Sequence, residues 1–370
     1  MRPRFGRSRA LGGAALTSVL LAGCGGDAAV PPEDAPPVPD ELACSEGTIS
    51  GAGSSAQELA MQVWIAGYQQ ECDDATINYD PIGSGGGRSQ FIDGAVTFAG
   101  TDAALHGEET EEARDRCAGA TPVNLPAFAV PIAVVYHVDG IDTGLNLSPE
   151  TIAGMFNQDI TAWDDPAIAA DNPDLDLPDT AIQPVSRSDE SGTTENFTEY
   201  LHAAAGEAWP HDASGQWPIE PVEAGQGNSG VASAVEGGDG MIGYVEVSHA
   251  GELDAANVGV GDAFVAPSPE AAGRVVAEAT PREGNEEHDL ALDLDYGTTA
   301  ADTYPVVLIA YEVACLAYDD AEEVDLLTGF LSYVVSEEGQ RAASAETGSA
   351  ILPESVRADV RAVVDVITVD

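Results

Sequence analysis

The sequence contains no lysine, and this absence limits what the protein can do. All 13 basic residues are arginines, against 64 acidic ones, and the formal net charge is −51. The phosphate-binding loop of P-loop NTPases needs a lysine after its second glycine, so nucleotide hydrolysis by that route is disfavoured. A chain this acidic repels the phosphates of nucleic acids, so we expect no nucleic-acid partner. An anion site in this chain would have to create its positive potential locally, from individual buried arginines.

Long hydrophobic runs are also scarce. The apolar run at 11–22 follows four arginines and is too short to span a bilayer comfortably. It ends in Leu-Ala-Gly-Cys at 21–24, which is typical of an export signal whose cysteine becomes lipidated. We therefore expect a signal peptide over 1–23, a lipid on Cys24 and a proline-rich tether over 24–47, with the rest of the chain held at the outer face of the cell membrane. A secretory signal with an incidental cysteine, or a short membrane anchor, is the alternative.

Cysteine is rare as well, and the remaining four residues are Cys44, Cys72, Cys117 and Cys315. An even number in an exported chain predicts two disulfides, and their spacings do not resemble a zinc site. Three pairings are possible. We favour Cys72–Cys117 with Cys44–Cys315, because the first two lie at the polar ends of early predicted helices.

What is present indicates an α/β fold. Residues 76–82 alternate in the manner of a strand, and 130–138 and 306–314 are continuous apolar runs rich in β-branched residues. Between these strands lie stretches with apolar residues at helical spacing. The body of more than 300 residues after the tether is large enough for two lobes.

Several helices and loops can be placed by the same periodicity. Leu59, Val63 and Ala66 mark the buried face of the first helix, and Ser148 with the proline after it predicts a capped helix start. The glycine-rich stretch 225–240 is assigned to loops or hinges by composition.

Three loops carry glycines and hydroxyl groups at predicted strand-to-helix junctions. They span 51–55, 82–91 and 187–194, and the second and third each contain an arginine. Backbone N–H groups at such helix starts form a seat for an anion. Each loop alone fits a flexible turn equally well, but three converging loops would bind a tetrahedral oxyanion.

These motifs resemble, in order and over nearly all of the mature chain, the lipid-anchored phosphate-binding proteins of the Pst-type ABC importer. The segments that carry the resemblance are 51–55, 79–91, 98–102, 160–166, 187–194, 240–246 and 304–315. The resemblance implies a two-lobed periplasmic-binding-protein (Venus-flytrap) fold with a mixed sheet in each lobe. It places the first lobe at 48–130 and 262–370 and the second at 131–261.

The resemblance also implies a set of phosphate ligands, which come from both lobes. They are the Ser55 hydroxyl, the Ala56 N–H, Ser84, Asp102, Arg187, Ser191, Gly192 and Thr193. Asp189 would brace Arg187. Arg88 stands where better-known members carry an apolar residue; we expect either a cation just behind the phosphate ligands or, as the favoured alternative, an arginine that pairs with surface acids.

The implied function is an extracytoplasmic, monomeric receptor that binds inorganic phosphate and delivers it to membrane permease subunits, without a cofactor or metal. Asp102 would accept the proton of hydrogen phosphate, which sulfate lacks. Arsenate is also protonated near neutral pH, so receptors for arsenate or sulfate are the alternatives within the binding class. A secreted phosphatase is disfavoured because the six histidines are scattered and no nucleophile motif or metal-ligand spacing is visible. A purely structural lipoprotein would not need the three hydroxyl-bearing helix starts.

Overall fold

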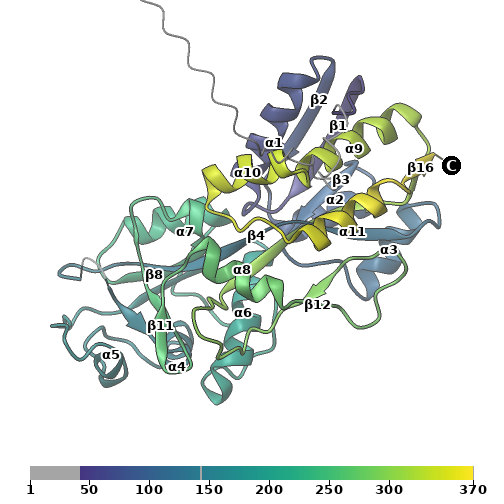
Figure 1. The fold of residues 1–370 in the computed structure, drawn as a ribbon. Coiled ribbons are helices and arrows are strands. Elements are labelled where there is room, and N and C mark those ends of the chain that lie inside the picture. Colours follow the sequence, from purple (N-terminus) through teal and green to yellow (C-terminus); the bar gives the residue numbers. More distant parts are fainter. Residues whose placement is uncertain (1–41, 142–143, 370) are drawn as a thin grey trace, which may run out of the picture. The chain divides into compact units, whose positions relative to one another are not determined.

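The computed structural model describes residues 42–141 and 144–369. Its main sheet has the strand order β2-β1-β3-β14-β4-β8-β6-β7, with β9 paired to β4 (Figure 1). The strands of this sheet are β1 (Gly47–Gly53), β2 (Ala75–Asp80), β3 (Phe98–Thr101), β4 (Pro122–His137), β6 (Gln183–Arg187), β7 (Glu223–Gly225), β8 (Met241–Glu246), β9 (Asp254–Ala255) and β14 (Val307–Cys315). The two predicted apolar strands are therefore present, and β4 begins eight residues earlier than 130.

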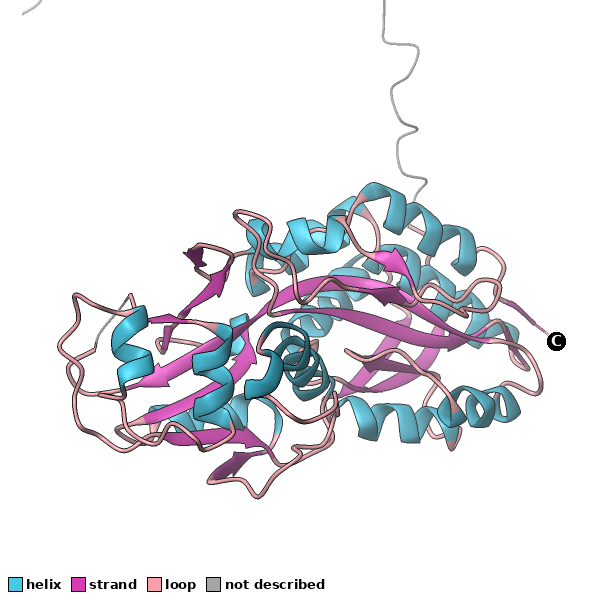
Figure 2. Cartoon of the chain, turned by 90° about the horizontal axis from the view of Figure 1, so that it is seen from below, coloured by secondary structure: helices cyan, strands magenta, loops and turns pink. Residues whose placement is uncertain are grey.

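Helices lie on both sides of the strands (Figure 2). They are α1 (Glu58–Glu71), α2 (Ser84–Ile92), α3 (Glu108–Arg116), α4 (Pro149–Phe156), α5 (Pro166–Asp171), α6 (Gly192–Ala204), α7 (Gly227–Glu236), α8 (Pro269–Ala277), α9 (Ala321–Val334), α10 (Glu337–Thr347) and α11 (Glu354–Val364). The short strands are β5 (Asn146–Leu147) with β10 (Asn257–Val260) and β11 (Ala263–Val265), β12 (Thr280–Pro281) with β13 (Leu292–Asp293), and β15 (Ala317–Tyr318) with β16 (Thr368–Val369). Among the described residues, no helix is long and apolar enough to cross a membrane.

The long strand β4 joins two lobes. Its residues 122–131 pair with β14, and from Ile132 onward it pairs with β8, antiparallel in both cases. We call the part built on β1, β2, β3 and β14 the first lobe, and the part built on β6, β7 and β8 the second lobe. Each combines parallel and antiparallel pairs, so both lobes have mixed sheets.

The first helix buries a different face from the one predicted. Leu59 and Val63 are only partly buried and Ala66 is exposed, whereas Trp64 and Tyr68 are fully buried. The Trp64 ring packs edge-on against Phe128 of β4, and its Nε1 donates to the Gly339 carbonyl at 2.9 Å. The buried face of α1 therefore carries Ala60, Met61, Trp64 and Tyr68 instead of the predicted residues. Helix α10, far along the chain, packs beside it (Figure 1).

The favoured disulfide pairing is wrong. The bonds join Cys44 to Cys72, with Cα atoms 5.2 Å apart, and Cys117 to Cys315, with Cα atoms 5.5 Å apart. The segment before β1 returns to the end of α1, where the Tyr68 hydroxyl donates to the Ala43 carbonyl at 2.8 Å. Leu42 already packs against the core, ahead of residue 48, while Cys24 lies outside the described residues.

The glycine-rich stretch 225–240 is not a loop throughout, because residues 227–236 form α7. Its glycines allow close packing: a Cβ at Gly225 of β7 would lie 2.4 Å from the carbonyl carbon of Gly230 in α7. Ser148 does cap α4, with its side chain accepting from the Thr151 N–H, as the sequence predicted.

Candidate functional site: an oxyanion site between the lobes

The site lies where parallel strands of both lobes end and helices begin. In the first lobe β1 leads to α1, β2 leads to α2, and β3 leads to Asp102; in the second lobe β6 leads to α6 and β7 leads to α7. Ligands of open α/β sheets bind at the carboxyl ends of such strands. The three predicted loops meet here, together with the turn that begins α7.

Asp102 is the centre of the hydrogen-bond network. Its side chain accepts from Ser54 at 2.5 Å and from Ser84 at 3.3 Å in the first lobe, and from Thr193 at 3.4 Å in the second. Only 3% of the residue is exposed. Burial raises the pKa of Asp102 to about 6, although these hydroxyl donors and the Arg187 charge oppose the rise. At neutral pH the group is therefore mainly an acceptor.

Arg187 supplies the local positive charge. Its Nε donates to Asp189 Oδ1 at 2.9 Å and its Nη2 to Asp189 Oδ2 at 2.5 Å, so the aspartate holds one edge of the guanidinium. The remaining nitrogen, Nη1, is buried and has no hydrogen-bond partner among the described residues. A buried guanidinium donor without an acceptor is costly, which indicates that this edge is built to meet an anion.

The first loop joins the two lobes through Asn228 of α7. The Ser55 hydroxyl accepts from the Asn228 backbone N–H at 3.2 Å and from its side-chain amide at 3.1 Å. The same amide reaches the Thr193 hydroxyl at 3.5 Å. The Ala56 N–H, which the resemblance makes a ligand, donates here to the Ser54 hydroxyl at 3.0 Å.

The start of α6 forms the remaining part of the site. Ser191 caps the helix by accepting from the Thr194 N–H at 3.2 Å. Gly192 and Thr193 lie in the first turn, where backbone N–H groups have no intrahelical acceptors. A Cβ at Gly192 would lie 2.7 Å from the Asp102 Cβ and 2.8 Å from the Ser84 hydroxyl. Only a glycine allows the helix end to approach the first lobe this closely.

The comparisons with known proteins agree with this geometry. Residues 38–338 match the family model described as a PBP superfamily domain. The chain is 35% identical over 355 residues to phosphate-binding protein PstS 3 of Mycobacterium leprae, covering 93% of this chain and 94% of the relative. It is 34% identical over 364 residues to phosphate-binding protein PstS 2 of Mycobacterium tuberculosis, covering 96% of both. The chain belongs to the PstS family of the PBP superfamily.

Solved structures show the same fold at lower identity. The ancestral soluble variant of the human phosphate binding protein superposes with a TM-score of 0.68 at 20% identity, covering 85% of this chain and 93% of the other. A high-affinity periplasmic phosphate-binding protein bound with phosphate (PfluDING) gives a TM-score of 0.67 at 21% identity, with the same coverage of both chains. This PstS-family chain therefore has the two-lobed periplasmic-binding fold.

Arg88 of this PstS-family chain is not a surface residue. It is 3% exposed, and its Nε donates to Glu109 at 2.9 Å within the first lobe. Its Nη2 donates to Glu190 of the second lobe at 3.2 Å, and its Nη1 to Thr101 at 3.2 Å. Arg88 does pair with partly exposed acids, but from a buried position between the lobes.

Four residues at the site have no counterpart in the sequence-based set: Ser54, Asn196, Asn228 and Tyr244. Asn196 donates to the Asp102 backbone carbonyl at 2.7 Å, and the Tyr244 hydroxyl bonds to Thr194 at 2.7 Å and to the Arg187 N–H at 3.2 Å. Ser54 adjoins a predicted ligand and could have been included on that ground. The others come from the first two turns of helices and from a strand, where no local signal marks them.

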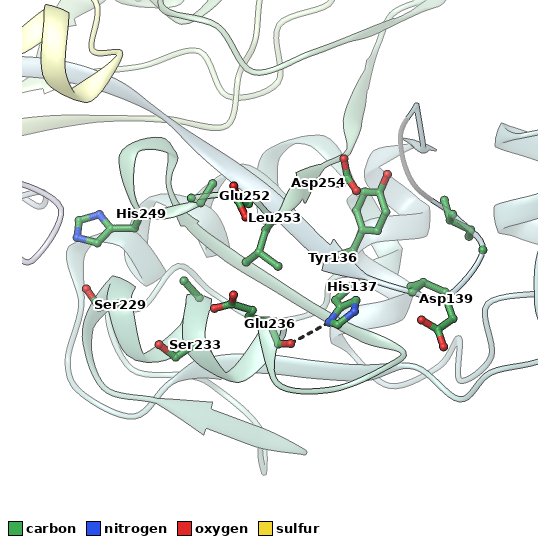
Figure 3. Close-up of a pocket in the computed structure, with 16 residues that line it drawn as sticks. Tyr136, His137, Asp139, Ser229, Ser233, Glu236, His249, Glu252, Leu253 and Asp254 are labelled. Atoms are coloured by element: carbon green, nitrogen blue, oxygen red, sulfur yellow. Dashed lines mark hydrogen bonds between the residues drawn. The ribbon is translucent and has the colours of Figure 1, made fainter.

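Two cavities differ in their relation to the site. A small one of about 30 Å³ is lined by Asp102, Asn196, Glu195 and Arg282, among others. A larger one of about 620 Å³ lies elsewhere in the second lobe, between the end of β4, α7 and residues 249–254 (Figure 3). In it, His137 Nδ1 lies 3.0 Å from the Glu236 carbonyl oxygen. The larger cavity shares none of the predicted phosphate ligands.

Proposed function

We propose that this protein is a receptor that captures one hydrogen phosphate between its lobes and delivers it to the permease of an ABC importer. The observation that carries this proposal is the unpartnered Nη1 of Arg187, buried at the meeting point of five strand ends. Hydroxyls, helix-start N–H groups and a guanidinium fork provide the many donors that a desolvated dianion requires. The relatives named as phosphate-binding proteins support the same ligand.

Asp102 supplies the selectivity in this proposal. A carboxylate accepts the proton of hydrogen phosphate, whereas sulfate would place a lone pair against it. Arsenate carries a proton as phosphate does, so a receptor for arsenate is the second candidate, and Asp102 does not separate the two.

The proposed ligands are Ser55, Ala56, Ser84, Asp102, Arg187, Ser191, Gly192 and Thr193, with Asp189 and Arg88 behind them. Ala56 would exchange its bond to Ser54 for one to the anion. We propose lobe boundaries near 130 and 261, lipidation of Cys24, and a position at the outer face of the cell membrane. We also propose that the protein is a monomer and does not catalyse a reaction. A closed, loaded form then differs in shape from the open form, which the permease can recognise.

The test is calorimetric titration of phosphate-stripped protein with phosphate, arsenate and sulfate, comparing the parent with Arg187→Ala. The variant should lose about 2–5 kcal/mol of phosphate binding free energy, because a desolvated charge pair is broken. Arg341→Ala is the control, since Arg341 is exposed and forms an ion pair with Glu337 one helical turn away. A phosphate affinity of Arg187→Ala within about threefold of the parent, with an unchanged melting temperature, would remove Arg187 from the site.

A further inference from the structure

Glu312 is a buried acid for which the oxyanion site gives no role. It lies in the middle of β14, is 1% exposed, and neither carboxylate oxygen has a hydrogen-bond partner among the described residues. A buried carboxylate without a partner is strongly unfavourable. Burial, and next the nearby Asp102 carboxylate, raise the pKa of Glu312 well above its ordinary value.

The sheet register places Glu312 directly behind the site. It pairs with Gly100 of β3, two residues before Asp102. Opposed residues of an antiparallel pair project from the same face of the sheet. On that face, a Cβ at Gly100 would lie 2.8 Å from Gln57 Oε1 and 2.3 Å from the Tyr79 hydroxyl. Because Gly100 has no side chain, Gln57 and Tyr79 fill the space beside it, on the face from which Glu312 projects.

Gln57 has a buried acceptor that lacks a hydrogen-bond donor within the described part of the chain. It is fully buried, and its Oε1 has no donor among the described residues. Its amide is oriented by Nε2, which donates at 3.1 Å to the carbonyl of Tyr311, the residue before Glu312. An ionised Glu312 can only accept, whereas a protonated one can donate. A single proton would therefore satisfy both side chains.

We propose that Glu312 carries a proton in the folded protein and donates it to Gln57 Oε1, and that it is thereby a positioning residue for the first anion-binding loop. Gln57 directly follows Ser54–Ala56, so this bond fixes that loop against the sheet. Because protonated Glu312 is neutral, it adds no second negative charge, beside that of Asp102, near the ligand. The titratable groups facing this space are Asp102 from the loop after β3 and Tyr79 from β2, with Glu58 of α1 beyond Tyr79; Arg187 acts on Asp102 from the second lobe.

The proton can be tested without any ligand, by thermal unfolding of phosphate-stripped protein. A carboxyl whose pKa is raised by folding lowers stability progressively as the pH rises above its unfolded value, about 4.3 for glutamate. Glu312→Gln removes this dependence, so its melting temperature should gain on that of the parent from about pH 5 to about pH 8. Glu346→Gln, at an exposed position of α10, should show no such widening. A difference between Glu312→Gln and the parent that is independent of pH, or that favours the parent more strongly as the pH rises, would show that Glu312 is ionised in the fold.

The positioning role rests on the proposed oxyanion function and is tested by phosphate titration of two variants. Glu312→Gln can still donate to Gln57 and should bind phosphate within about threefold of the parent, whereas Glu312→Leu cannot and should bind at least about tenfold more weakly. The melting temperature of Glu312→Leu at about pH 5 checks its fold. Equal phosphate affinities of the two variants would overturn the positioning role. If the parent and both variants bind no phosphate, the proposed function fails, while the unfolding series still decides whether Glu312 holds a proton.

Discussion

At Asp102, burial and hydrogen bonding act on the pKa in opposite directions. Burial is the larger effect, which is why the pKa lies at about 6 in spite of three hydroxyl donors and the Arg187 charge. The carboxyl group thus changes from acceptor to partial donor just below neutral pH. Its role in choosing between anions must depend on pH for the same reason.

Selectivity for phosphate over sulfate should therefore be highest above about pH 6 and should decline on both sides of an optimum. As the pH falls through the pKa of Asp102, the protonated group can donate to sulfate; at alkaline pH phosphate loses its own proton and becomes more like sulfate. Asp102→Asn, whose amide can donate at any pH, should bind sulfate better relative to phosphate. Competition titrations at three pH values measure this, with Asp93→Asn at an exposed position as the control. A variant that still excludes sulfate as strongly as the parent would make Asp102 a structural acid.

At the scale of the element, the strand-to-helix junctions were the parts of the structure that the sequence predicted best. Glycines and hydroxyls in 51–55, 82–91 and 187–194 mark local backbone needs, such as the positive φ of 99° at Gly83 before α2. A proline after a serine marked the start of α4 for the same local reason. These signals depend only on neighbouring residues, so they can be recognised without knowledge of the fold.

The features that could not be predicted from the sequence depend on contacts between distant segments. The pairing of Cys44 with Cys72 requires the chain before β1 to return to the end of α1, and no local pattern records that return. Likewise, Gln57 reaches the Tyr311 carbonyl, next to Glu312, only because β14 lies between β3 and β4. Asn228 was missed because α7 is rich in small residues that usually favour loops.

The close approach of α6 to the first lobe can be tested with Gly192→Ala. The added Cβ would meet Asp102 and Ser84 at 2.7 and 2.8 Å, contacts that exist only when the lobes are together. Phosphate should bind at least about tenfold more weakly, while the ligand-free protein should lose no stability, since alanine is the better helix former. Gly273→Ala in α8 is the matched control, because its new Cβ would lie an ordinary 3.4 Å from the Ala350 Cβ. Equal phosphate affinities of the two variants would show that the gap between α6 and the first lobe is wider than described.

At the scale of the whole molecule, closure of the two lobes brings side chains from different lobes into contact. Arg88 is the clearest case, because one buried guanidinium binds Glu109 of its own lobe and Glu190 of the other. The same cation therefore contributes to the fold of the first lobe and to the stability of the closed form.

Glu190→Gln separates these two contributions, because it removes only the bond between the lobes. Glu190 is 45% exposed at its side chain, so the pair is partly screened and the loss should be about 0.2–1 kcal/mol. Stopped-flow measurement should show phosphate dissociating up to about fivefold faster, with little change in melting temperature, and the difference from the parent should shrink at about 1 M salt. Glu109→Gln is the control within one lobe. It should lower the melting temperature and leave the dissociation rate close to that of the parent. If the two variants speed dissociation equally, Arg88 acts by supporting the first lobe, and closure is held by Asn196, Asn228 and the anion.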